Sequence, residues 1–238
     1  SSAASDVYKR QTFIRFTTED GLYSNRIRDF QEDHLGNIYF DTGSGVNKYT
    51  GTEIVKLTVV HDTTKANLLT DNDLWFAGKW NTNGVYRCDG QFLYYHELSD
   101  HPLEKEARSV NPSFSFNPYA CYTTFKDRDG NVWMGGSTFG ASRFDGNTLF
   151  WISEREMTEI DPSPAMGVRS IVQDKQGNFY FASHVDTKYR VIEQDGVLSY
   201  EKLAGVPTSS REDVYSDCIS MEIDDNDHIW MAHYKGCL

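Results

Sequence analysis

The chain has little of what marks several large classes of protein. Its four cysteines show no C-x-x-C spacing and no paired histidines, which argues against the common zinc and dithiol motifs. No apolar run approaches the roughly 18–20 residues that a membrane helix needs, so no membrane segment is expected. Lysine and arginine (23) are outnumbered by aspartate and glutamate (35), for a net charge of −12, so nucleic acid is not an expected partner.

Motifs of the common enzyme classes are also missing. The sequence contains no G-x-S-x-G, no H-E-x-x-H and no phosphate-binding loop. We therefore expect no cofactor and assign no catalytic residue. The four cysteines are expected to occupy small, buried, apolar positions, as free cysteines usually do.

Aromatic residues, which make up 14% of the chain, recur within a repeated pattern. The intervals are close to the ~40–50 residues of a propeller blade. Because side chains alternate along a strand, the aromatic and the Phe or Met that follows it point to opposite faces, and other sheets must cover both. The five copies are GNIYFDT around Tyr39, NDLWFAG around Trp75, GNVWMGG around Trp133, GNFYFAS around Tyr180 and DHIWMAH around Trp230.

Each copy is interpreted as up to four short strands separated by turns. Asp-Gly and Gly-Asn dipeptides at the turns are typical of hairpins. In the second copy only Ala66–Leu69 is available as a first strand, and the last strand of the first copy is expected over Glu53–Val60. The pattern predicts an all-β fold, a β-propeller of about five four-stranded antiparallel blades. In the third copy the strands are expected at Cys121–Lys126, Val132–Met134, Ala141–Phe144 and Thr148–Ile152.

The ends of the chain differ from the repeats. We expect residues 1–12 to form a disordered or non-native tail, and Phe13–Thr17 to be an isolated strand that pairs near Gly236–Leu238 and closes a ring. The alternative is an arc cut from a larger ring. The propeller is expected over residues 13–238, with repeats at about 26–60, 66–98, 119–153, 168–203 and 217–238.

The first copy, EDGLYSNRIRDFQEDHLGNIYFDTGSGVNKYTG, resembles the two-component regulator propeller repeat. Asp20-Gly21-Leu22, Asn25, Gly36-Asn37 and Tyr49 match that repeat, and Tyr39 stands where it has tryptophan. The resemblance implies a periplasmic or extracellular sensor half of a bacterial signalling protein, with a ligand that is often a carbohydrate. The sequence itself contains no kinase motif, receiver domain or membrane helix.

Candidate ligand-binding residues come from the loops and from the starts of the first strands. The long links between repeats are predicted to be irregular loops and to gather on one face, where binding usually occurs. Trp80, Tyr119 and Phe139 lie in these loops, and exposed aromatics there suit sugar or aromatic ligands, although packing within the loops explains them equally well. Asn25, Arg26, Arg169 and Asp217 are also candidates, the last three at the starts of innermost strands, where charges alternatively line a water-filled axis.

His184 and His233 follow the second strands of adjacent copies and could converge as a ligand pair or an acid–base pair. The alternative is that both histidines are solvent-exposed loop residues with no shared role. Asp127-x-Asp129 and Asp225-x-Asp227 resemble calcium loops only superficially, because Thr138 stands where a bidentate acid is needed. Asx turns explain these aspartates better, so no metal is expected.

Three functions follow from these observations. A non-enzymatic sensor or ligand-binding propeller is favoured. The second is implied by a resemblance, because the short Trp-Phe repeats are similar to those of streptogramin lyases: a metal-dependent lyase of that type, with His184 or His233 as its base. The third is a scaffold that binds proteins through one face.

Overall fold

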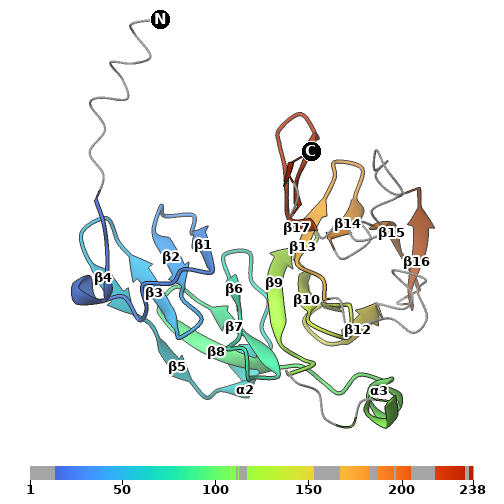
Figure 1. Cartoon of the computed structure of the whole chain (residues 1–238), viewed down its shortest axis with the longest axis horizontal. Helices are drawn as coiled ribbons and strands as arrows, with labels where there is room; N and C mark the ends of the chain where they lie inside the picture. The colour runs from blue at the N-terminus through green and yellow to red at the C-terminus, as the bar shows by residue number, and fades with distance from the viewer. Residues whose placement is uncertain are drawn as a thin grey trace, which may run out of the picture. The chain divides into compact units, whose positions relative to one another are not determined.

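The computed structural model describes residues 14–110, 112, 117–152, 167–182, 187–195, 197–204, 218–233 and 236–237 (Figure 1). The chain divides into two compact units, Ser1–Leu57 and Thr58–Leu238, and each is described by itself. In the described part of the chain, no helix has both the length and the apolar character needed to cross a membrane.

The first unit contains one four-stranded antiparallel sheet, as predicted for the first copy. The strands follow one another in chain order, and each pairs with the next. The last strand ends at Lys56, earlier than the expected Val60. The strands are β1 (Asp29–Glu32), β2 (Ile38–Asp41), β3 (Val46–Tyr49) and β4 (Ile54–Lys56).

In the first unit a capped turn, η1 (Thr18–Asp20), leads into the DGLYSN segment, and that segment docks on β3. Thr17 and Asp20 cap the turn reciprocally, and Gly21 takes a φ of 110° that favours glycine. The Asn47 side chain of β3 accepts a hydrogen bond from the Tyr23 N–H (2.9 Å) and donates one to the Gly21 carbonyl (3.1 Å). These glycine and asparagine positions therefore hold the turn on the sheet.

The second unit contains three four-stranded sheets and one three-stranded sheet. In two of the four-stranded sheets, and in the three-stranded one, neighbours are consecutive antiparallel strands. The elements are β5 (Thr58–Val60), α2 (Thr63–Ala66), β6 (Leu74–Ala77), β7 (Gly84–Cys88), β8 (Phe92–Glu97), α3 (Glu104–Val110), β9 (Cys121–Lys126), β10 (Val132–Gly136), β11 (Ala141–Phe144), β12 (Leu149–Ile152), β13 (Ser170–Gln173), β14 (Asn178–Ala182), β15 (Thr187–Gln194), β16 (Val197–Leu203), β17 (Cys218–Ile223), β18 (Ile229–His233) and β19 (Gly236–Cys237).

One hydrogen-bonded turn recurs in four sheets. In the third copy, Asp127 accepts bonds from the N–H and side chain of Asn131 and from Trp133 Nε1 (2.9 Å). The carboxylate thus braces the hairpin turn against the aromatic of the strand that follows, and the Asx-turn interpretation of this aspartate is confirmed. The same arrangement joins Asp33, Asn37 and Tyr39, then Asp174, Asn178 and Tyr180, then Asp224, His228 and Trp230.

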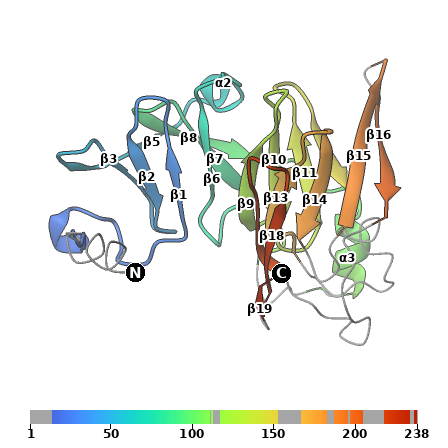
Figure 2. The same cartoon turned by 90° about the horizontal axis from the view of Figure 1, so that it is seen from above.

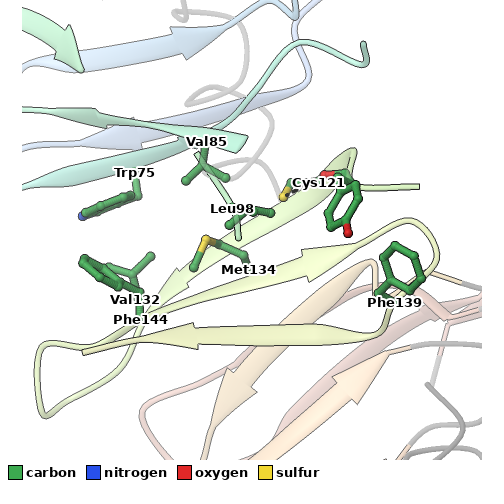
Figure 3. Close-up of a cluster of buried hydrophobic side chains, with 9 residues drawn as sticks. Trp75, Val85, Leu98, Cys121, Val132, Met134, Phe139 and Phe144 are labelled. Carbon is green, nitrogen blue, oxygen red and sulfur yellow. Dashed lines mark hydrogen bonds between the residues drawn. The ribbon is translucent and has the colours of Figure 1, made fainter. Parts of the chain in front are cut away.

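The core of the second unit lies between successive sheets. Trp75 of β6 and Val85 of β7 face Met134 and Phe144 of the following sheet, as Figure 3 shows. Trp133 repeats this contact one sheet later, because its ring packs on Phe179 and Phe181. Tyr180 does so against the three-stranded sheet. Both faces of a strand that carries the aromatic are therefore covered, as the sequence predicted for the internal copies.

The cysteine prediction holds for the three cysteines whose side chains are described. Cys88, Cys121 and Cys218 are buried and are not joined to one another by disulfides. Each lies in a strand, and Cys121 and Cys218 belong to the apolar clusters between sheets. They therefore act as small apolar residues.

Three expectations for the second unit's first half are wrong. Ala66–Leu69 is not a strand: Asp62 accepts a hydrogen bond from the Lys65 N–H and caps the short helix α2 instead. The segment after Lys56 forms a separate strand, β5, which pairs in parallel with β8. The link before Tyr119, predicted to be irregular, contains helix α3.

The predicted closing strand is also wrong for the residues that the structure describes. Ile14–Thr17 forms no strand, and the ring of Phe16 packs on Tyr49 with centroids 5.1 Å apart. Gly236–Cys237 forms β19 and pairs with β18. Ile14–Thr17 is therefore held by an apolar ring contact and not by the backbone pairing that was expected. Phe13 and Leu238 lie outside the described residues.

Candidate functional site

An aromatic strip with a cation at one end lies across three successive sheets of the second unit. Strand β6 packs against β9, and β9 against β13 (Figure 2). Trp80 follows β6, Tyr122 is the second residue of β9, and Arg169 immediately precedes β13. The ring centroids of Trp80 and Tyr122 are 5.2 Å apart, and the guanidinium carbon of Arg169 lies 4.8 Å from the Tyr122 centroid. We call Trp80, Tyr122 and Arg169 the Trp–Tyr–Arg strip.

The backbone positions each member of the strip locally. Trp80 lies in a tight turn in which the N–H and hydroxyl of Thr82 both donate to the Lys79 carbonyl. Tyr122 is the extra residue of a β-bulge, since Cys121 and Thr123 pair with consecutive residues of β10. A bulge changes the direction of a side chain, and here it leaves Tyr122 between Trp80 and the arginine.

Close backbone contact brings Arg169 to Tyr122. The Val168 N–H donates to the Gly136 carbonyl at 2.9 Å, which joins the start of β13 to the end of β10. A Cβ atom on Gly167 would lie 2.3 Å from that carbonyl oxygen and 2.3 Å from Tyr122 Cε2. Only a residue without a side chain fits at this distance, so Gly167 permits the approach of the two sheets.

The strip is partly open to solvent and carries positive charge. Trp80 is 45% exposed, while Tyr122 and Arg169 are half-buried. Within the described residues, the Arg169 guanidinium faces no carboxylate, although the whole chain has a net charge of −12. Chemically, the strip presents two aromatic rings, tilted by 50° to one another, beside a set of hydrogen-bond donors. It contains two sequence-predicted residues, Trp80 and Arg169.

Sequence reasoning missed Tyr122. It was assigned to a first strand and treated as structural. A signal was present, because alternation puts Tyr122 on the face opposite to the buried Cys121. An aromatic on that face of an innermost strand is a candidate ligand contact.

Of the two alternatives for Tyr119 and Phe139, exposure and packing within the loops, the structure supports packing. Both are buried, with ring centroids 5.0 Å apart, and Phe139 stacks on His101. The Tyr119 hydroxyl accepts a hydrogen bond from the His101 N–H and donates one to Glu104, each at 2.8 Å. Burial, together with the Glu104 carboxylate, raises the pKa of Tyr119 to about 12. Large aromatic surfaces gain more from packing under the link that contains α3 than from exposure.

The other predicted residues are not part of the strip. Asn25 and Arg26 belong to the first unit, where both are exposed and Asn25 accepts a hydrogen bond from the Thr18 N–H (2.8 Å). His184 and Asp217 lie outside the described residues. His233 ends β18 and pairs with Gly236, but its side chain is outside the description.

The described part of the chain contains no group of three or more His, Cys, Asp or Glu side chains placed to hold a metal ion. Two of the four aspartates that resemble calcium ligands have other partners. Asp127 braces its turn, as described above, and Asp227 accepts a hydrogen bond from the Lys175 N–H at 2.9 Å. These carboxylates therefore have structural roles in the turns.

No protein-family model matches the chain, and no curated protein matches its sequence. Solved structures do match. A catalytically inactive virginiamycin B lyase from Staphylococcus aureus, solved with quinupristin, has a TM-score of 0.60 and 13% identity over 90% of this chain and 66% of its own. The structure of a streptogramin B lyase has a TM-score of 0.54 and 15% identity, over 87% of this chain and 62% of its own.

The third neighbour is the extracellular domain of a B. thetaiotaomicron protein described as a one-component or hybrid two-component system. Its TM-score is 0.60 at 12% identity, over 96% of this chain and 28% of its own. The chain thus spans less than two thirds of each neighbour's length. These neighbours are β-propellers, and the likeness shows the fold alone: an all-β chain of mostly four-stranded antiparallel sheets.

Proposed function

We propose that the chain is a non-enzymatic, ligand-binding β-propeller of about five blades, from the periplasmic or extracellular part of a bacterial signalling protein. The ligand is a saccharide, and it binds at the Trp–Tyr–Arg strip. Two independent likenesses support this proposal. The fold is shared with the extracellular domain of a two-component system, and the first repeat resembles the two-component regulator propeller repeat.

The exposure of Trp80 is the observation that carries the proposal. Indole is the largest apolar side chain, and 45% exposure leaves roughly 100 Å² of it in water. At about 25 cal/mol per Å², covering that surface would contribute about 2–3 kcal/mol to binding. A pyranose ring offers a flat C–H face that covers an indole, while its hydroxyls accept hydrogen bonds from a neighbouring guanidinium.

Calorimetric titration with a panel of neutral and acidic oligosaccharides tests the proposal. Trp80→Ala should weaken the binding of whichever saccharide binds by about tenfold or more, because the stacking surface is lost. Trp230→Ala is the matched control: Trp230 is 60% exposed in the same unit but lies on β18, outside the strip. It should leave the affinity unchanged. Equal affinities for wild type and Trp80→Ala would refute the assignment of the site.

The lyase likeness supports a second candidate, because two streptogramin lyases share the fold. In that case His184 or His233 would act as the base with a bound metal. Incubation with quinupristin and Mg²⁺, followed by liquid chromatography and tandem mass spectrometry, would detect a ring-opened product, because elimination within a ring leaves the mass unchanged but alters retention and fragmentation. We expect no turnover. Turnover that is lost in His233→Ala would replace the sensor proposal with the lyase.

A further inference from the structure

Arg169 differs from the other buried or half-buried arginines of the described chain in what it faces. Arg87 and Arg143 each lie near a carboxylate, with nitrogen–oxygen distances of 2.7 Å to Asp73 and 3.9 Å to Asp127. Arg169 has no carboxylate or hydrogen-bond acceptor for its guanidinium within the described residues, and it lies over the ring of Tyr122. Its charge is therefore held in place by an aromatic face.

This arrangement leaves the hydrogen-bonding capacity of Arg169 available. A guanidinium has five N–H donors in a rigid fork, and that fork matches the two oxygens of a carboxylate or the oxygens of a sulfate. Stacking on a ring fixes the orientation of the fork without using the donors. Partial burial also weakens the screening of the charge by water, so an anion bound there interacts more strongly than at an exposed lysine.

We propose that the ligand is an acidic saccharide, and that Arg169 binds its carboxylate or sulfate group. The sugar ring that carries the anion lies beside Tyr122 and Arg169, and the adjoining ring stacks on Trp80. This assignment rests on the proposed function, since it names the class of saccharide that the strip selects. In a chain of net charge −12, a specific cation is needed to hold an anion against the general repulsion.

The first test uses the unmodified protein and three probes: trigalacturonate, its full methyl ester and maltotriose. The ester keeps the sugar faces and removes the negative charge. We expect trigalacturonate to bind about tenfold or more tightly than the ester, as the loss of a charge-assisted bidentate contact requires. A 6-O-sulfated maltotriose distinguishes the two anions, because preference for it over trigalacturonate identifies sulfate as the recognised group.

The second test uses Arg169→Gln, with Arg190→Gln as the matched control. Arg190 also lies in the second unit, but its partner is Glu201 at 2.9 Å and its side chain is 54% exposed. Arg169→Gln should abolish the preference for the acid over the ester, because the charge is lost. It should lower the affinity for the ester less than that for the acid, because the aromatic surface remains and the glutamine amide still donates to sugar hydroxyls. Arg190→Gln should retain the full preference.

The outcomes separate this inference from the proposed function. If the ester and the acid bind equally well, and Trp80→Ala weakens both, the saccharide site stands and the acidic class is wrong. If no probe binds, both are wrong. If Arg169→Gln does not fold, the comparison of acid with ester on the unmodified protein still decides the question.

Discussion

Replacement of Trp133 by alanine tests whether the core lies between successive sheets. The Trp133 side chain is fully buried, and its ring centroid lies 4.6 Å from that of Phe179 and 5.5 Å from that of Phe181. Its Nε1 also donates to Asp127 at 2.9 Å. Truncation removes these contacts and leaves a cavity, so we expect a loss of about 3–5 kcal/mol in the free energy of unfolding.

Trp230 separates the contribution of packing from that of the hydrogen bond. It occupies the same position in its repeat, and its Nε1 donates to Asp224 at 3.2 Å, but the side chain is 60% exposed. Trp230→Ala should therefore cost less than about 1 kcal/mol. Urea denaturation followed by far-ultraviolet circular dichroism measures both variants, since tryptophan fluorescence would itself be altered. A cost below about 1 kcal/mol for Trp133→Ala, or equal costs for the two, would refute this account of the core.

Two further predictions concern the approach of the sheets and the response to pH. Gly167→Ala should lower the free energy of unfolding by about 1–3 kcal/mol and weaken saccharide binding, because the new Cβ would lie 2.3 Å from the Gly136 carbonyl oxygen. Gly130→Ala is the control: Gly130 has a φ of +85° but no atom within 4 Å of a Cβ, so the substitution should strain its turn and leave binding intact. Unchanged saccharide binding in both variants would contradict the role of Gly167. Burial lowers the pKa of His96 from 6.5 to about 4. The unfolded chain therefore binds a proton that the folded chain does not, and the free energy of unfolding should fall by up to about 3 kcal/mol as the pH is lowered from 6.5 to 4. In His96→Gln the urea midpoint should depend less on pH across that range. An unchanged dependence would show that another group is responsible.

The parts of the fold that could be predicted from the sequence are those that depend on neighbours along the chain. The hairpin after Asp127 needs only a turn of the right residues and an alternating strand on each side, and its register follows from the turn. The sheet β9–β12 was accordingly predicted to within two residues at each strand end. The bracing of the turn by Asp127 was predicted from the same local pattern.

The parts that could not be predicted depend on distant partners. β5 pairs with β8 across more than thirty positions of the chain, and nothing within Thr58–Val60 specifies a parallel neighbour. The burial of Tyr119 depends on the path of a link that no periodicity describes. The Trp–Tyr–Arg strip arises from three sheets at once, so positions within the repeats suggested Trp80 and Arg169 but not the ring between them.

The aspartate-braced turn has a consequence for how such a chain evolves. Each of the four carboxylates accepts hydrogen bonds from groups no more than six residues away, so each repeat carries the bracing of its own hairpin. A duplicated repeat can therefore form its own braced hairpin. From the neighbouring repeats it requires only an apolar face that packs against its aromatic residue. Gain or loss of a repeat is thus a single genetic step, while a contact such as the one at Gly167 has to be rebuilt on both sides. The number of repeats can change faster than the surface that recognises a ligand.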